Sequence, residues 1–288
     1  MNLPLSGLPF GGGDNFFVAK LHVLIKDVMH KVKQLTINPR LKVSRSNLNF
    51  KCLGSEYGGW VFAHSENLLD STIISCGLGE DASFDVEIAS QYGLRVLFID
   101  PTPRAVVHFG KILNRLGKVN TVEYSKGGDQ PAEAYNLIKL KSDCFKLFPK
   151  AIWIDDKPVR FYSPPNAEHV SHSILNYQNN YATDTRYIEV EAITLKKLIE
   201  TESLKSIPLI KLDIEGAEIE VIHGFLREGI FPEQILVEYD ELSTPSLKSR
   251  RRINGCHKKL TSSGYSLVSY SSPSNFLYIS NKAFGIYK

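Results

Sequence analysis

The feature that most constrains the fold is an apolar run that passes through two closely spaced glycines into a polar, helix-competent segment. It is the stretch IISCGLGEDASFD, residues 73–85. Glycine permits a strained backbone, and its missing side chain lets a ligand lie against the main chain. The first amides of the following helix suit a phosphate or a carboxylate. The stretch therefore predicts a nucleotide-binding turn at Gly77 and Gly79, with Leu78 and Glu80 beside the ligand.

Short β-branched runs alternate with amphipathic segments around this turn. The first strands are expected at 72–76 and 95–99, and the first helices at 82–91 and 103–116. This β-α-β-α order implies a parallel sheet covered on both faces. Further strands are expected at 151–154, 159–162, 187–193, 207–212 and 234–238, and further helices at 216–227 and 246–262.

The chain closes with two apolar runs, 265–270 and 275–280, joined by Ser-Ser-Pro-Ser. Strands joined so tightly must pair antiparallel. Two regions show little periodicity: 36–56 is polar, and 118–149 is expected to be loop with a short helix. Residues 16–35 have helical spacing and predict an amphipathic helix packed on the domain or on a second subunit, which leaves a homo-oligomer open.

Composition narrows the class of protein. A chain of 288 residues with 43% hydrophobic residues can bury a substantial core. Its formal charge of +3 is too small to argue for nucleic acid or membrane, and no window approaches a membrane span. The basic run at 248–252 is interpreted as a solvated helix face, with contact to an acidic ligand as the alternative. We expect no nucleic-acid partner and no membrane partner.

The four cysteines are far apart and form no C-x-x-C pair, which argues against zinc and against a disulfide scaffold. Cys76 is expected to be a small buried hydrophobe. The N-terminal stretch has no basic region ahead of its apolar residues and does not resemble a signal peptide. These features predict a reducing, cytoplasmic setting.

Asp100 is the expected acidic partner of the glycine turn. It ends the apolar run RVLFI, 21 residues beyond Gly79, and precedes Pro101. A carboxylate there can accept hydrogen bonds from both ribose hydroxyls of an adenosyl group. The alternatives are a glycine turn that only eases packing and an aspartate that only shapes a turn. The pair favours an adenosine-containing cofactor without choosing between hydride and methyl transfer, since the turn also fits G-x-G-x-x-A.

The stretch IKLDIEGAEIEVIHGFL, residues 210–226, resembles the FkbM family of S-adenosylmethionine-dependent methyltransferases, in which such a strand runs into D-x-E-G-A-E and a helix. The resemblance covers residues 54–280. It implies a Rossmann-like class I methyltransferase fold, an α/β architecture with a mostly parallel seven-stranded sheet ending in an antiparallel hairpin. Four further stretches are similar to the family: GSEYGGW (54–60), LFIDPTP (97–103), EHVSHSI (168–174) and ILVEYDE (235–241).

The resemblance also implies the cofactor, S-adenosylmethionine, at the glycine turn and Asp100. Asp155, just after the run AIWI, corresponds to an acidic position that follows the fourth strand and lies near the adenine, with a turn residue as the alternative. One position departs from the family. Ser75 stands where an acidic residue often precedes the first glycine, so that a contact to the cofactor's amino group is lost or taken over by another residue.

Carboxylates gather where the strand at 207–212 ends. Asp213 is expected at the carboxyl edge of the sheet, where ligands of open α/β sheets bind, followed by Glu215 and Glu218 at the helix start. Such a cluster can face a sulfonium, hold an acceptor hydroxyl or bind Mg²⁺ through oxygen ligands. The alternative is that these residues cap the helix or are solvated.

A hydroxyl acceptor must lose a proton, which calls for a general base. His172 is the first candidate, with Ser171 and Ser173 as hydrogen-bonding partners; His169 is the second, and Asp213 is the rival base. We expect Tyr57 and Trp60 to line the acceptor pocket, or else to pack in the core.

The sequence thus predicts an S-adenosylmethionine-dependent methyltransferase domain over residues 69–288 with an N-terminal extension over 1–68. The family implies O-methylation of a sugar, glycan or small-metabolite hydroxyl. Two alternatives stay open. An NAD(P)-dependent oxidoreductase would use the same glycine turn, but no hydride-transfer constellation in the second half of the chain supports it. An inactive cofactor-binding adaptor is kept open by Ser75. A nucleic-acid methyltransferase is disfavoured because the chain has no Asn-Pro-Pro-Tyr-type pocket and no aromatic-basic stripe.

Overall fold

The computed structural model describes residues 36–163, 173–175, 182–243, 245–271 and 274–284. The helix expected over 16–35 lies outside these ranges, as do His169, Ser171 and His172.

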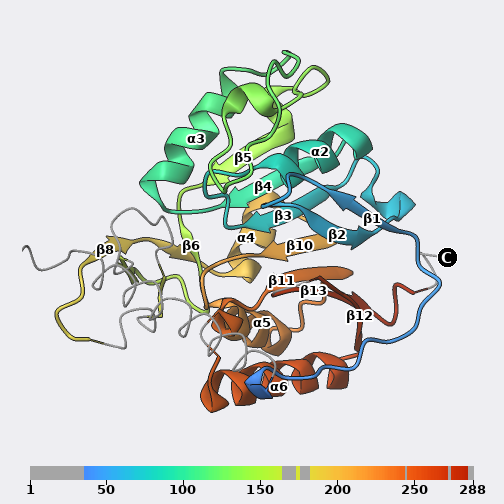
Figure 1. The fold of residues 1–288 in the computed structure, drawn as a ribbon, viewed down its shortest axis with the longest axis vertical. Helices are drawn as coiled ribbons and strands as arrows, with labels where there is room; N and C mark the ends of the chain where they lie inside the picture. The colour runs from blue at the N-terminus through green and yellow to red at the C-terminus, as the bar shows by residue number, and fades with distance from the viewer. Residues whose placement is uncertain (1–35, 164–172, 176–181, 244, 272–273, 285–288) are drawn as a thin grey trace, which may run out of the picture.

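A seven-stranded sheet forms the centre of the molecule, in the order β12-β13-β11-β10-β3-β4-β5 (Figure 1). The strands from β11 to β5 run parallel, and β13 is antiparallel to both β11 and β12. This arrangement confirms the mostly parallel sheet with a closing antiparallel hairpin. The strands are β3 Thr72–Cys76, β4 Arg95–Ile99, β5 Phe145–Phe148, β10 Leu209–Leu212, β11 Gln234–Glu238, β12 Tyr265–Ser271 and β13 Asn275–Ser280.

Helices cover both faces of the sheet because side chains of successive strand residues point to opposite faces. One face packs under α2 and α3, and the other under α4, α5 and α6 (Figure 1). The α-helices are α2 Ser83–Tyr92, α3 Pro103–Leu113, α4 Leu195–Glu202, α5 Glu218–Arg227 and α6 Leu247–Ser262. Short 3₁₀ helices are η1 Glu66–Leu68, η2 Ala132–Ala134, η3 Ser142–Cys144 and η4 Asp240–Leu242.

The helix starts follow local chemistry. Thr102 caps α3 by accepting the Ala105 N–H, and Pro103 occupies the first turn, where its missing N–H costs nothing. Ser246 caps α6 through a reciprocal contact with Ser249. These signals explain why the helices expected at 103–116 and 246–262 begin where the sequence predicts.

A hairpin that the sequence did not predict lies beside the sheet. It consists of β1 Phe50–Leu53 and β2 Trp60–Ala63, paired antiparallel. The buried side chain of Gln234 joins this hairpin to β11: its Oε1 accepts the Ala63 N–H at 2.9 Å, and its Nε2 donates to the Ala63 carbonyl at 2.9 Å. One side-chain amide thereby makes the two hydrogen bonds to Ala63 that the backbone of a neighbouring strand would otherwise make.

The expected loop at 118–149 was only partly right, because it contains β5, the edge strand of the sheet. Only Phe145 and Phe148 of β5 are buried. A four-residue strand with one neighbour buries little side-chain surface, so its pattern is weak.

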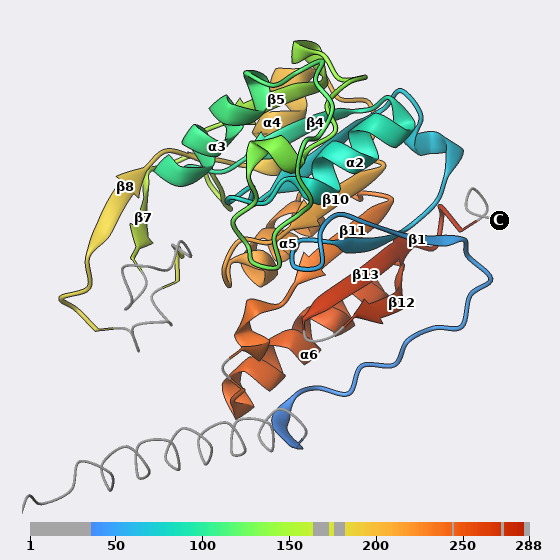
Figure 2. The same ribbon diagram turned by 45° about the horizontal axis from the view of Figure 1, so that its top comes forward.

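The run at 151–154 was wrongly interpreted as the fourth strand of the sheet, which in chain order is β10. Its first two residues form β6 Ala151–Ile152, paired parallel with β9 Ala192–Ile193 in a separate two-stranded sheet. The run at 187–193 is likewise two strands, β8 Tyr187–Val190 and β9, which are separated by Glu191. β8 pairs with β7 Val159–Tyr162, and the two extend from the body as an arm (Figure 2).

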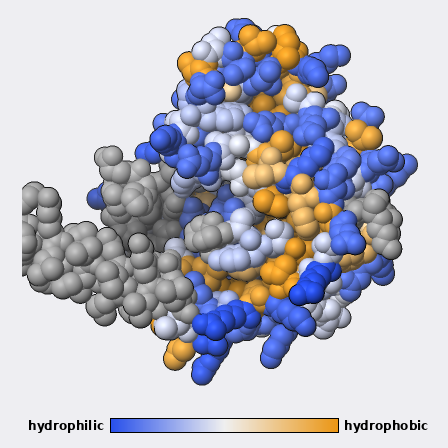
Figure 3. All heavy atoms as spheres, turned by 45° about the vertical axis from the view of Figure 1, so that its right-hand side comes forward, coloured by the Kyte–Doolittle hydropathy of each residue, from blue (hydrophilic) through white to orange (hydrophobic). Residues whose placement is uncertain are grey.

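The surface is mixed in character. On the face shown in Figure 3, apolar residues form an interrupted band among hydrophilic ones. All four cysteines are free thiols, and Cys76 is buried as expected. Within the described ranges, no helix combines the length and the apolar character that a bilayer crossing requires.

We predict that Gln234→Leu lowers the free energy of unfolding by about 2–4 kcal/mol, because the buried N–H and C=O of Ala63 lose their partners. Urea unfolding followed by circular dichroism measures the change. The control is Gln91→Leu on the exposed side of α2, which should shift stability by no more than about 0.5 kcal/mol. Equal effects of the two substitutions would contradict the strand-like role of Gln234.

Candidate functional site

The glycine turn between β3 and α2 lies directly against the end of β10. Gly77 has φ +86°, and a Cβ built there would overlap the carbonyl oxygen of Asp213. Gly79 also has a positive φ, +53°, but faces open space. Gly77 is therefore required by the close approach of two backbone segments, whereas Gly79 leaves room beside the turn for a ligand.

Asp100 holds the turn from the end of β4. Its Oδ2 accepts the N–H groups of Leu78 at 3.0 Å and Gly79 at 2.9 Å. Its Oδ1 accepts the N–H of Thr102 at 2.8 Å and the hydroxyl of Thr102 at 2.7 Å. A carboxylate offers about four lone-pair positions, so all of them are in use. Asp100 lies beside the turn as expected, but it can accept ribose hydroxyls only by giving up some of these contacts.

The remaining residues predicted at the turn take supporting positions. Leu78 is buried in the core, and Pro101 links Asp100 to the α3 cap. The Glu80 carboxylate pairs with Arg104 at 3.3 Å, and its carbonyl accepts the N–H of Gln130. Glu80 therefore fixes the loop at 125–130 against the turn.

Lys211 lies buried beneath the turn on β10. Its ammonium donates to the Gly77 carbonyl at 2.8 Å, lies 3.5 Å from Asp213 Oδ2 and sits 5.6 Å from the centre of the Trp60 ring. Burial alone would lower the pKa of Lys211, but neighbouring carboxylates, Asp213 foremost, raise it above its ordinary value. The group is thus a fixed positive charge under the site.

Asp85 on α2 places a carboxylate on the same face of the sheet as Ser75. Burial raises the pKa of Asp85 to about 6, while Lys211 and Ser75 lower it. The side chain is fully buried. It balances the charge of Lys211 and is not exposed to a ligand, so a carboxylate lies beside Ser75 without restoring the family's cofactor contact.

Two carboxylates meet at the carboxyl edge of the sheet. The parallel register pairs Leu212 of β10 with Val237 of β11, which makes Asp213 and Glu238 the next neighbours. Burial raises the pKa of Glu238 to about 7, and the charge of Asp213 adds to the rise. The hydroxyl of Ser274 donates to Glu238 Oε1 at 2.6 Å. Asp213 and Glu238 are thus neighbouring carboxyl groups whose charges interact.

The β1–β2 loop forms one wall of this edge. The Ser55 hydroxyl donates to Asp81 Oδ2 at 2.6 Å and accepts the N–H of Gly58 at 2.8 Å, which anchors the loop to the turn. Tyr57 lies at its tip, with its ring against Gly128. Although 69% exposed, its side chain is sufficiently surrounded that burial raises its pKa, and Asp213 adds to the rise.

Trp60, predicted to line the acceptor pocket with Tyr57, is only 3% exposed. Its indole packs in the core and faces Lys211. The alternative reading of Trp60 as a core residue describes its position.

The carboxylates of the D-x-E-G-A-E segment do not gather as one cluster. Glu218 is buried, and its Oε1 accepts the N–H groups of Ile214 and Gly216 at 3.0 Å each. Glu215 has φ +56°, and its carbonyl accepts the Ser173 hydroxyl at 2.6 Å. Ser173 therefore ties the arm to the segment after β10. Among the described residues, no three potential metal ligands come together, so the structure gives Mg²⁺ no support.

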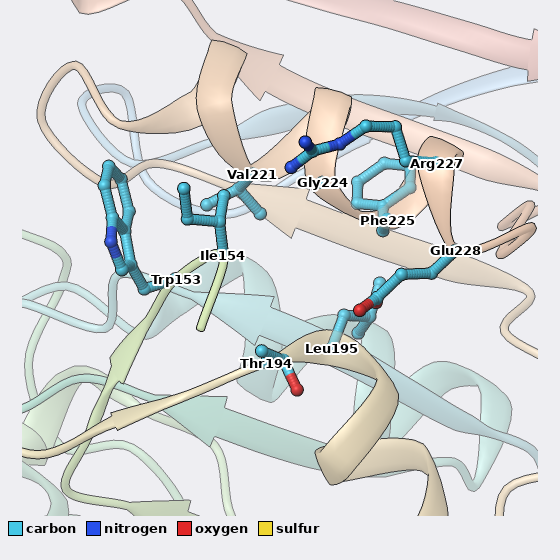
Figure 4. Close-up of a pocket in the computed structure, with 9 residues that line it drawn as sticks. All are labelled: Trp153, Ile154, Thr194, Leu195, Val221, Gly224, Phe225, Arg227 and Glu228. Carbon is cyan, nitrogen blue, oxygen red and sulfur yellow. The ribbon is translucent and has the colours of Figure 1, made fainter. Parts of the chain in front are cut away.

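Asp155 does not follow a strand of the central sheet. It is exposed in the bend before β7, where its Oδ1 accepts the Lys157 N–H at 3.1 Å. The residues before it, Trp153 and Ile154, line a cavity of about 220 Å³ together with residues of α5, and Ile154 packs against Gly224 of that helix (Figure 4). Because 151–154 is not the fourth strand of the sheet, the expected correspondence of Asp155 to an adenine-side position loses its basis.

An α/β sheet with a glycine turn and an acidic carboxyl edge is the arrangement of a protein that binds a small ligand at that edge. The model of the methyltransferase FkbM domain matches residues 55–251. The chain therefore belongs to the FkbM methyltransferase family. No curated protein and no solved structure matched the chain.

Sequence reasoning missed Lys211 and Glu238. Lys211 is a charged residue in an otherwise apolar strand, which is itself a signal of a paired buried charge. Glu238 ends the strand ILVE as Asp213 follows the strand IKL. Two acidic residues at the ends of consecutive parallel strands are expected to meet, because those ends lie at one edge of the sheet.

We predict that Gly77→Ala destabilises the chain by about 3 kcal/mol or more, since both the φ and the overlap with Asp213 oppose a side chain. The control is Gly117→Ala, which has φ +77° but open space around it and should cost about 1–2 kcal/mol. Urea unfolding of both variants compares them. A Gly77→Ala cost no larger than the control's would show that the turn can move away from β10.

Proposed function

We propose that the chain is an S-adenosylmethionine-dependent O-methyltransferase with a Rossmann-like class I fold, acting on a hydroxyl of a sugar, glycan or small metabolite. The observation that carries the proposal is the acidic edge beside the glycine turn. Asp213 and Glu238 lie next to the glycine turn, and the space beside Gly79 in that turn is open. A negative edge of this kind favours a cationic ligand.

S-adenosylmethionine supplies a methyl group activated by its positive sulfonium. The turn at Gly77 and Gly79 offers backbone for the ligand to lie against, and Asp100 offers its carboxylate to the ribose hydroxyls. Because four hydrogen bonds already occupy the Asp100 carboxylate, the ribose hydroxyls can bind it only by replacing hydrogen bonds from the N–H groups of Leu78 and Gly79. Those N–H groups then face the ligand.

The chain's main task in methyl transfer is positioning and the exclusion of water. Tyr57 on the β1–β2 loop lies near the acidic edge and packs its ring against Gly128 of the loop at 125–130. An acceptor hydroxyl held there lies next to Asp213, which makes Asp213 the candidate base among the described residues. His172, with Ser171 and His169, remains a prediction outside the described ranges.

We assign the catalytic domain to residues 69–288 and the extension to 1–68, with the hairpin of the extension contributing Tyr57 to the site. A small-molecule or glycan acceptor, no nucleic-acid or membrane partner and a cytoplasmic setting complete the proposal. An NAD(P)-dependent oxidoreductase and an inactive adaptor are the rival functions that the experiment below separates.

We predict that S-adenosylmethionine and S-adenosylhomocysteine bind the purified chain with micromolar affinity in calorimetric titrations and that NAD⁺ does not. Binding followed by methyl transfer to a panel of sugars and polyols would support the enzyme. Binding without transfer to any acceptor favours the adaptor, and binding of NAD⁺ alone contradicts the proposal.

We further predict that Asp100→Ala weakens S-adenosylmethionine binding at least 100-fold, because the ribose loses its acceptor and the turn loses its anchor. The control is Asp143→Ala, an exposed aspartate ahead of β5, which should bind as the wild type does. Unchanged affinity in Asp100→Ala removes the ribose contact.

A further inference from the structure

We propose that Asp213 and Glu238 form a carboxyl dyad that shares one proton and that this dyad is the general base for the acceptor hydroxyl. The inference rests on the proposed function and names a catalytic residue, Glu238, in that site. It follows from the strand register, the hydrogen bond from Ser274 and the charges around the pair.

The register fixes the two groups side by side. Leu212 pairs with Val237 in parallel strands, so Asp213 and Glu238 leave the sheet at the same level. Both lie on the face that carries Lys211, because side chains two residues apart point the same way. The backbone fixes both positions: Glu238 is the last residue of β11, and the Asp213 N–H donates to the Cys76 carbonyl at 3.1 Å.

Two carboxylates held together cannot both ionise easily, so one proton is retained to a higher pH than either would hold alone. The Ser274 hydroxyl engages Glu238 Oε1 at 2.6 Å, which assigns the shared proton to Oε2 and Asp213. Burial of Glu238 strengthens the effect, and its pKa is raised accordingly.

Charges from several elements act on the dyad. The positive charge of Lys211 on β10 favours loss of the shared proton, whereas the negative charge of Asp213 favours its retention on Glu238. The phenol of Tyr57 lies near the same two carboxylates. A general base works best when its pKa is near the operating pH. The groups that surround the dyad are Lys211 on β10, Glu215 after it, Tyr57 on the β1–β2 loop, Asp81 in the glycine turn, Asp85 on α2 and Ser274 before β13.

The charges balance over the reaction. A cation at the edge favours the doubly ionised dyad, so binding of a sulfonium expels the shared proton. In the transfer, the acceptor oxygen forms a bond to the methyl carbon, the bond from that carbon to sulfur breaks with its electrons left on sulfur, and the acceptor's proton passes to Glu238 Oε2. The positive charge is lost from the sulfur as the dyad regains one proton.

The first test needs no ligand. In the full chain labelled with ¹³C at glutamate carboxyl carbons, we expect a signal that titrates well above the ordinary glutamate pKa of about 4.3 and vanishes in Glu238→Gln. The signal of Glu218, whose pKa burial also raises, should remain in that variant. Ser274→Ala should shift that titration to higher pH, because the serine hydroxyl lowers the pKa of Glu238. Titration of Glu238 in the ordinary range overturns the dyad.

The second test measures affinity by calorimetry at pH 6 and pH 7. If only the doubly ionised dyad accepts the sulfonium, S-adenosylmethionine should bind about fivefold more tightly at pH 7, whereas neutral S-adenosylhomocysteine should change little. Glu238→Gln should remove the dependence. Glu200→Gln, an exposed carboxylate on α4, should keep it.

The outcomes separate the two proposals. Binding of S-adenosylmethionine with no more pH dependence than S-adenosylhomocysteine, or a dependence that persists in Glu238→Gln, overturns the dyad and leaves the proposed function standing. Binding of neither ligand to the wild type overturns the proposed function, and with it the role of the dyad as a base. With an acceptor in hand, Glu238→Gln should lower the transfer rate at least 100-fold.

Discussion

One buried ammonium group, that of Lys211, holds together the elements on which the site depends. It binds the carbonyl of Gly77, pairs with Asp213 and lies over the ring of Trp60. An isolated ammonium in such a place would cost several kcal/mol, and the nearby carboxylates of Asp213 and Asp85 compensate for it. The glycine turn, the β1–β2 hairpin and the end of β10 are therefore joined by electrostatics as well as by packing. Replacing the lysine would leave two acidic groups without their counter-charge.

The central sheet could be predicted because its strands are buried on both faces. The runs at 72–76, 95–99 and 234–238 are continuous apolar stretches between turn signals, and their bounds agree with β3, β4 and β11. The edge elements could not. β5 alternates Phe145 with exposed Lys146, and β1 shows an equally short pattern. Where a strand has one neighbour and one exposed face, little apolar sequence marks it.

The site divides in the same way. Asp213 and Asp100 could be placed from the sequence, since each follows a strong apolar strand. What they contact could not, because hydrogen bonds from Leu78 and Gly79 to Asp100 depend on how the turn folds back. Glu238 was not predicted as a site residue because its neighbour, Asp213, lies 25 residues away in the chain and is brought beside it only by the register of two strands. Asp155 was misplaced because the apolar run before it, 151–154, was taken for the fourth strand of the central sheet, to which it does not belong.

The pairing of Gln234 with Ala63 has a consequence for synthesis. The two residues are 171 positions apart, so the hairpin leaves the ribosome long before its partner strand exists. At usual elongation rates the delay is about 10 to 30 s. During that time the N–H and C=O of Ala63 lack the side-chain amide that pairs with them in the folded chain. The order of translation thus leaves this edge of β2 unpaired until β11 has been made.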